Sequence, residues 1–199
     1  MLTDRQDQEE TVLNGLEIGG GSGHRPATSS PRLVAFKGPA GSGKSTLSRA
    51  LSRQLGWPVI DKDDVRDFLD DSNPGLAYDV MFNIARRQLL QDLNVICDSP
   101  LSSQKGYDHA IHIADETKAA LVVVECLCPD DAVWRDRINA RKALNLPSHH
   151  ATDWDIMQAH RAGRADPARY AINHPYLVVN TLEPIADLCA QVVAWLEQR

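Results

Sequence analysis

One stretch of the chain has the residue types and spacing of a phosphate-binding loop. Residues 38–46 fit the pattern G-x-x-x-x-G-K-[ST] at every defined position. Glycines let the backbone curl so that successive N–H groups point at one anion, and a following helix adds the positive end of its dipole. In such a loop Lys44 reaches the β- and γ-phosphates, and the Ser45 hydroxyl ligates Mg²⁺. The predicted nucleoside triphosphate contacts are Gly38, Pro39, Ala40, Gly41, Ser42, Gly43, Lys44, Ser45 and Thr46.

The segments on either side supply the strand and the helix that this loop requires. Residues 33–36 form an apolar run, which is suited to a buried strand. After the loop, Leu47, Ala50, Leu51 and Leu55 recur at helical spacing, and Gly56 is a typical helix end. We therefore predict a strand, the phosphate-binding loop and a helix in direct succession.

The remainder of the chain continues this alternation of apolar strands and amphipathic helices. Further strands are expected at 59–60, 94–98, 120–126 and 176–180, and further helices at 65–69, 78–93, 105–118, from 129 onward, and 184–196. Such alternation predicts an α/β fold with a parallel sheet covered on both faces. Ligands of such sheets bind beyond the carboxyl ends of the strands. Residues 1–31 are expected to be a flexible N-terminal tail, and residues 32–199 the folded domain.

Composition places the chain among ordinary globular proteins. It has 199 residues, of which 43% are hydrophobic and 24% charged, and this length fits one domain. No apolar run approaches the roughly 20 residues of a membrane span, so we expect a soluble cytoplasmic protein with no membrane partner. The net charge of −6 argues against broad binding to a nucleic-acid backbone but leaves open a strand end in a small pocket. The four cysteines are expected to be buried free thiols.

An acidic cluster follows the second predicted strand. A carboxylate at this edge of the sheet, beside the phosphate-binding loop, could orient an acceptor hydroxyl and take its proton. Asp63 is the favoured base, with Asp61 and Asp64 as rivals, and Asp64 could instead cap the next helix. Arg66 is a helical neighbour of Asp63 and could bind the acceptor or pair with the acids.

A further acid and a group of arginines follow the third and fourth predicted strands. Asp98 ends an apolar strand, where it could hold the metal through water or touch the substrate, or simply cap a turn. Arg137 and Arg141 share a helical face, with Arg135 nearby, and such a cluster suits the spread charge of a transferring phosphoryl group. The solvated helix face is the alternative.

These segments together resemble the P-loop kinase superfamily, and within it the small AAA_33-type group, which is similar to the polynucleotide kinase domain, zeta toxins and chloramphenicol phosphotransferase. The resemblance is carried by residues 38–46, 60–66, 95–100 and the spacing Arg137-x-x-x-Arg141. It covers about residues 32–196. It implies a three-layer P-loop fold with five parallel strands in the order 2-3-1-4-5 and a mobile lid at about residues 142–171.

The resemblance also implies roles for individual residues. The position that matches the base of polynucleotide kinase is Asp63, and the arginine that follows on the acceptor side matches Arg66. The lid arginines of these kinases clamp phosphates, which suggests that role for Arg137 and Arg141. Beyond Asn145, the basic segment that includes His149, His150, His160, Arg161 and Arg164 matches no acceptor motif and is interpreted as solvated lid.

The sequence as a whole thus predicts an ATP- and Mg²⁺-dependent phosphotransferase that acts on a hydroxyl of a small molecule. The expected catalytic residues are Asp63, Lys44, Arg66, Arg137 and Arg141; the acceptor would contact Asp63, Arg66 and Asp98; Ser45 and Asp98 would hold the metal. A polynucleotide 5′-hydroxyl kinase, a nucleoside monophosphate kinase and an ATP-binding switch with little turnover remain as alternatives.

Overall fold

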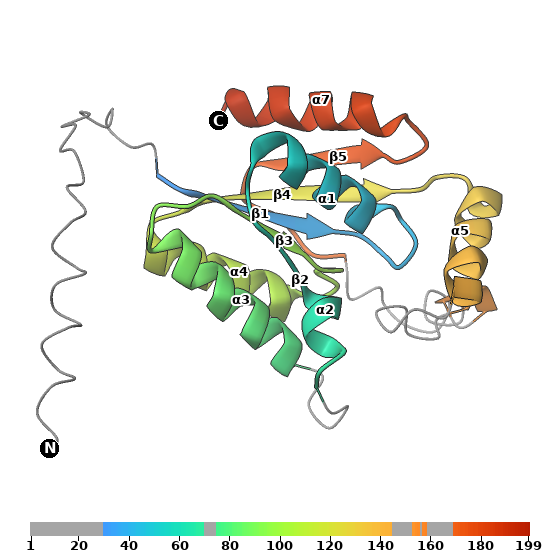
Figure 1. Cartoon of the computed structure of the whole chain (residues 1–199), viewed down its shortest axis with the longest axis horizontal. Helices are drawn as coiled ribbons and strands as arrows, with labels where there is room; N and C mark the ends of the chain where they lie inside the picture. Colours follow the sequence, from blue (N-terminus) through green and yellow to red (C-terminus); the bar gives the residue numbers. More distant parts are fainter. Residues whose placement is uncertain (1–29, 70–74, 145–152, 156, 159–168) are drawn as a thin grey trace, which may run out of the picture.

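The computed structural model describes residues 30–69, 75–144, 153–155, 157–158 and 169–199. Within these residues one five-stranded sheet has the order β2-β3-β1-β4-β5 (Figure 1). The strands are β1 (Arg32–Lys37), β2 (Val59–Asp61), β3 (Val95–Asp98), β4 (Ala120–Leu127) and β5 (Tyr176–Asn180). All neighbouring strands pair in parallel, which confirms the predicted fold class and strand order.

Helices cover both faces of the sheet. They are α1 (Lys44–Leu55), α2 (Lys62–Arg66), α3 (Leu76–Leu89), α4 (Gln104–Thr117), α5 (Asp131–Leu144) and α7 (Ile185–Glu197). One core lies between the sheet and the pair α3 and α4, and a second lies between the sheet and the pair α1 and α7 (Figure 1). Alternate residues of each central strand enter the two cores: Leu33 packs on one side and Val34 on the other. The result is the predicted three-layer arrangement.

The strand register brings the predicted acidic residues together. Asp61 at the end of β2 pairs in register with Asp98 at the end of β3. Beside them, β1 ends at Lys37, directly before the phosphate-binding loop. Because parallel strands end at the same edge of a sheet, one edge collects the loop and both carboxylates.

Two predicted helices had the wrong bounds, for local reasons. Helix α2 begins at Lys62 instead of Val65, because the Asp61 side chain accepts a hydrogen bond from the Asp63 N–H and caps the helix there. Asp64 is therefore not the cap. Helix α3 ends at Leu89 instead of Leu93, because the chain turns at Asp92, whose φ of 59° lies in the left-handed region.

The remaining predictions concern the cysteines, membrane-spanning helices, the N-terminal tail and the lid. All four cysteines are buried free thiols, as expected. None of the described helices is long and apolar enough to cross a membrane. The predicted tail lies almost wholly outside the described residues, as does most of the predicted lid, including His149, His150, His160, Arg161 and Arg164.

Candidate active site

The phosphate-binding loop is held by backbone contacts that only glycines permit. At Gly38, φ is 139°, its N–H donates to the Pro100 carbonyl at 3.1 Å, and a Cβ there would lie 2.5 Å from the Cys126 carbonyl oxygen. At Gly41, φ is 74°, and a Cβ would lie 2.7 Å from the Ile138 side chain. The loop is therefore fixed against β4 on one side and α5 on the other.

Helix α5 also holds the loop through the side chain of a tryptophan, Trp134. Trp134 packs edge-on against Trp154, with ring centroids 5.6 Å apart, in a small cluster that includes Ile138. Its indole Nε1–H donates to the Ala40 carbonyl at 2.8 Å. Trp134 is therefore a buried packing residue, and the same side chain orders the loop. An isolated tryptophan in a helical pattern carries no signal for this contact.

Lys44 is buried inside the loop that it serves. The residue is 8% exposed, and its ammonium donates to the Pro39 carbonyl at 2.9 Å. Burial lowers the pKa of Lys44, while the negative charge of Asp98 acts in the opposite direction. A cation held in a place with little water interacts strongly with an incoming phosphate.

Asp98 is buried at the end of β3 and faces α1. It is 2% exposed, and its Oδ2 accepts a hydrogen bond from the Ser48 hydroxyl at 2.9 Å. Ser48 was missed in the sequence, although it lies one helical turn after Lys44 and thus on the same side of α1. This bond leaves the other carboxylate oxygen, Oδ1, for a metal-bound water or a substrate group.

The three acids near α2 have different surroundings. Asp61 is engaged at both oxygens: Oδ1 accepts from the Asp63 N–H at 2.9 Å and Oδ2 from the Arg49 guanidinium at 3.2 Å. Burial, followed by the nearby charge of Asp98, raises the pKa of Asp61 to about 6. Asp63 instead pairs with the Lys62 ammonium at 2.6 Å, and its side chain is 32% exposed.

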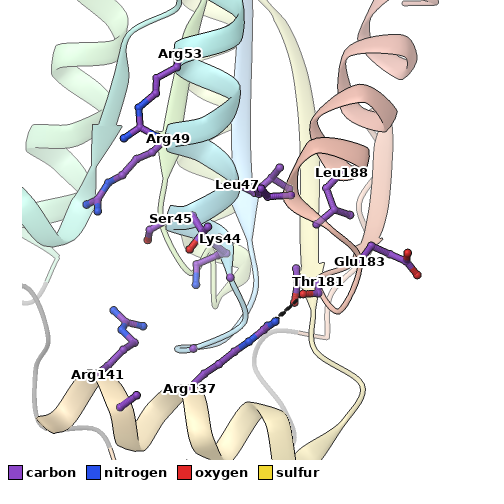
Figure 2. A pocket seen from close by; sticks show the side chains of 15 residues that line it. Lys44, Ser45, Leu47, Arg49, Arg53, Arg137, Arg141, Thr181, Glu183 and Leu188 are labelled. Carbon is purple, nitrogen blue, oxygen red and sulfur yellow. Dashed lines mark hydrogen bonds between the residues drawn. The ribbon is translucent and has the colours of Figure 1, made fainter. Parts of the chain in front are cut away.

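Two cavities meet at the phosphate-binding loop. The larger, about 690 Å³, is lined by Gly41, Gly43, Lys44, Ser45, Thr46, Leu47, Arg49, Arg53, Arg137, Ala140, Arg141, Thr181, Glu183, Ile185 and Leu188 (Figure 2). The smaller, about 180 Å³, is lined by Ala40, Lys44, Ser45, Asp61, Lys62, Asp63, Arg66, Asp98, Ser99, Pro100, Ile138, Arg141 and Lys142. Lys44, Ser45 and Arg141 line both.

Most predicted site residues line one cavity or the other. Asp63, Arg66 and Asp98 come together in the smaller cavity, and Arg137 lines the larger one. Gly38, Pro39 and Ser42 line neither, and Ser42 is fully buried within the loop. The loop residues thus divide into those that line a cavity and those that shape the backbone.

The three arginines of α5 do not act as one cluster. Arg137 donates from Nη1 to the Thr181 hydroxyl at 3.0 Å and from Nη2 to the Thr181 carbonyl at 2.7 Å (Figure 2). Arg135 points elsewhere: its guanidinium lies 5.2 Å from the centre of the Trp154 ring, and it lines neither cavity. Thr181 was missed, although it directly follows β5 at the ligand-binding edge.

Two oxygen donors, Ser45 and Asp98, lie at or beside the wall that the two cavities share, and they fit a magnesium ion. Ser45 lines both cavities, and the carboxylate of Asp98 lines the smaller one beside it. Hydroxyl and carboxylate oxygens suit Mg²⁺, which keeps several water or phosphate ligands. Among the described residues no group of three or more His, Cys, Asp or Glu could hold a metal. The ion would therefore take most of its ligands from phosphates and water.

A comparison with known families now decides the family of this chain. The sequence model of AAA_33, described as an AAA domain, matches residues 33–167, more than half of the chain. This chain belongs to the AAA_33 family. The uncharacterized protein Rv2004c of Mycobacterium tuberculosis is 30% identical over 173 residues, which cover 73% of this chain and 34% of that protein. The AAA_33 chain thus spans about a third of the length of the curated relatives that it matches.

Solved structures agree with this AAA_33 assignment at the level of the fold. A protein from Chloroflexus aurantiacus has 19% identity and a TM-score of 0.68, covering 83% of this chain and 98% of that one. The APS kinase CysC of Mycobacterium tuberculosis, in complex with AMPPNP and APS, has 16% identity and a TM-score of 0.61, covering 84% of this chain and 98% of that one. The AAA_33 domain described here therefore has the fold of P-loop kinases, as predicted.

Proposed function

We propose that this chain is an ATP- and Mg²⁺-dependent kinase that phosphorylates a hydroxyl of a small-molecule acceptor. The observation that supports this proposal most strongly is that the two cavities share one wall. Lys44, Ser45 and Arg141 line both a cavity that is large enough for a nucleotide and a smaller one that holds Asp63 and Asp98. A phosphoryl group at this wall would face a donor on one side and an acceptor on the other.

On the donor side, charge is arranged around the β- and γ-phosphates. The loop N–H groups and Lys44 would bind these phosphates, and Ser45 with Asp98 would hold Mg²⁺, which offsets charge on the phosphate oxygens. Arg141 would contact the transferring group, because it reaches both cavities. Arg137 is fixed to Thr181 at the β5 end of the large cavity, so it is better placed for the nucleoside than for the transferring phosphate.

On the acceptor side, Asp63 is the proposed base. Both oxygens of Asp61 already accept hydrogen bonds, and Asp64 does not line the smaller cavity. Asp63 would take the hydroxyl proton as the acceptor oxygen bonds to the γ-phosphorus and the bond from that phosphorus to the bridging oxygen of ADP breaks. Arg66 lines the same cavity and would orient the acceptor. Lys62, paired with Asp63, keeps the carboxylate in place.

A metabolite screen tests this proposal. Purified protein is incubated with γ-labelled ATP, Mg²⁺ and a small-molecule extract, and labelled products are identified by mass spectrometry. We expect a labelled phosphate ester with wild type and none with Lys44→Ala; Lys105→Ala, an exposed lysine on α4, should behave as wild type. Label in nucleoside diphosphates or on oligonucleotide ends would favour the alternative kinases. Tight ATP binding with no labelled product would favour the switch.

A further inference from the structure

The large cavity has two chemically different ends. At one end, Thr181, Glu183 and the apolar side chains of Ile185 and Leu188 provide the mixed surface that a ribose and a base require. At the other end the lining side chains are Arg49 and Arg53, which extend from α1 away from Thr181 and Glu183 (Figure 2). The proposed nucleoside accounts for the first end and leaves the arginine end without a ligand.

Arg49 and Arg53 lie on the same face of α1 as Ser45, the proposed metal ligand. Ser45, Arg49 and Arg53 are spaced by four residues, so Arg53 lies about 12 Å along the helix from Ser45. The helix contains three cationic residues and no acid, although the whole chain carries a net charge of −6. Like charges four residues apart destabilise a helix unless an anion offsets them, and the Asp61 carboxylate contacts Arg49 but is not in contact with Arg53.

The arginine end is connected to the smaller cavity. The Arg49 guanidinium contacts Asp61, which lines the smaller cavity together with Asp63. Arg53 is exposed and makes no hydrogen bond or ion pair with any other residue of the described segments. A ligand whose hydroxyl lies at Asp63 could therefore extend past Asp61 and place a charged group against both arginines.

We propose that Arg49 and Arg53 bind an anionic group of the acceptor, which makes the acceptor a small hydroxylated anion such as a phosphate monoester or a carboxylate. This inference rests on the proposed kinase function. A long polyanion is disfavoured, because Asp64 on helix α2 and Asp67 directly after it are exposed. The nucleoside end of the cavity also contains an acid, Glu183.

Fractionation of the extract tests the acceptor class. The extract is separated by anion exchange into neutral and anionic small molecules, and oligonucleotides are removed by size and assayed separately. We expect label from γ-labelled ATP to enter the anionic small molecules. Label found only in neutral metabolites, or only on oligonucleotide ends, would overturn the inference while leaving kinase activity intact.

A matched pair of variants tests the arginines themselves. Arg53→Gln should raise the KM for the anionic fraction about tenfold and leave the KM for ATP unchanged, since one charge-assisted contact is lost. Arg87→Gln is the control, because Arg87 is an exposed arginine of α3 that lines neither cavity. Equal KM values for the acceptor in the two variants would contradict the inference.

A binding measurement separates this inference from the proposed function. Inorganic phosphate is titrated into Mg²⁺- and AMPPNP-saturated protein, and the arginine Nε–H signals are followed by NMR. The signals of Arg49 and Arg53 should shift in the millimolar range, whereas the Arg87 signal should not. If no fraction accepts label, the kinase proposal fails, and this titration alone decides the anion site: shifts support it, and their absence overturns it.

Discussion

The donor side and the acceptor side of this site are built differently. On the donor side, the loop is held through its own backbone: the Gly38 N–H donates to the Pro100 carbonyl, and the Ala40 carbonyl accepts from the Trp134 indole. On the acceptor side, the five-residue helix α2 is positioned by side chains, with Asp61 as its cap and Arg49 behind it. Backbone contacts demand particular residue types at fixed spacing, whereas side-chain contacts can be made by many combinations. The donor half therefore carries a specific sequence motif, whereas the acceptor half offers only candidate residues such as Asp63, Arg66 and Asp98.

The largest expected effect separates Asp63 from its neighbour Asp64. Asp63→Asn should lower kcat by about 10²–10⁴-fold, because the acceptor hydroxyl loses its base. The KM for ATP should stay near the wild-type value. Asp64→Asn is the matched control, since Asp64 is exposed and lies outside the smaller cavity. Steady-state kinetics with the labelled acceptor give kcat and the KM for ATP of each variant. Equal losses of kcat in the two variants would exclude Asp63 as the base.

A second effect separates two arginines of the same helix. Arg141→Gln should reduce kcat about 100-fold, because the charge that develops on the transferring phosphoryl group is no longer offset. Arg135→Gln should have little effect on turnover, since Arg135 lies over the Trp154 ring and lines neither cavity. Single-turnover rates would show the difference. A comparable loss in Arg135→Gln would mean that the whole cationic helix face acts as one unit.

A smaller effect tests how the donor side holds Arg137. Thr181→Val removes the hydroxyl that accepts from Arg137 and donates to the Leu127 carbonyl at 3.0 Å. We expect the nucleotide Kd to rise about five- to tenfold, since each hydrogen bond contributes roughly 1 kcal/mol. Thr117→Val is the control: it makes the same change at a buried threonine whose hydroxyl donates to the Ile113 carbonyl within α4. Calorimetry should show that only Thr181→Val weakens nucleotide binding.

The smallest expected effect concerns the pH dependence of stability. The pKa of Asp61 is raised from 3.8 to about 6, so the folded chain keeps a proton there that the unfolded chain releases. Ionised Asp61 therefore lowers the free energy of unfolding progressively as pH rises from about 4 to 6. Asp61→Asn removes this titration, and Asn still caps α2. The Tm of the variant relative to wild type should be higher at pH 7 than at pH 4, and a pH-independent difference would contradict the raised pKa.

The sequence pattern predicted the strands and the edge at which the site lies, and the resemblance to P-loop kinases implied the strand order. The strands and the edge depend on local apolar patterns and on the loop motif, so they need no knowledge of distant contacts. The start of α2 was missed, because the side chain that caps it belongs to the preceding strand. The different roles of Arg135 and Arg137 were missed too, because each depends on a partner far along the chain, Trp154 for one and Thr181 for the other.

The most direct test of the shared-wall arrangement compares Lys44→Ala and Asp63→Asn in one experiment. Nucleotide affinity is measured by calorimetry with Mg²⁺ and AMPPNP, and transfer is measured with γ-labelled ATP and the identified acceptor. We predict that Lys44→Ala loses both affinity and transfer, whereas Asp63→Asn keeps the affinity and loses the transfer. An Asp63→Asn protein that still transfers phosphate at the wild-type rate would contradict the division into a donor cavity and an acceptor cavity with Asp63 as base.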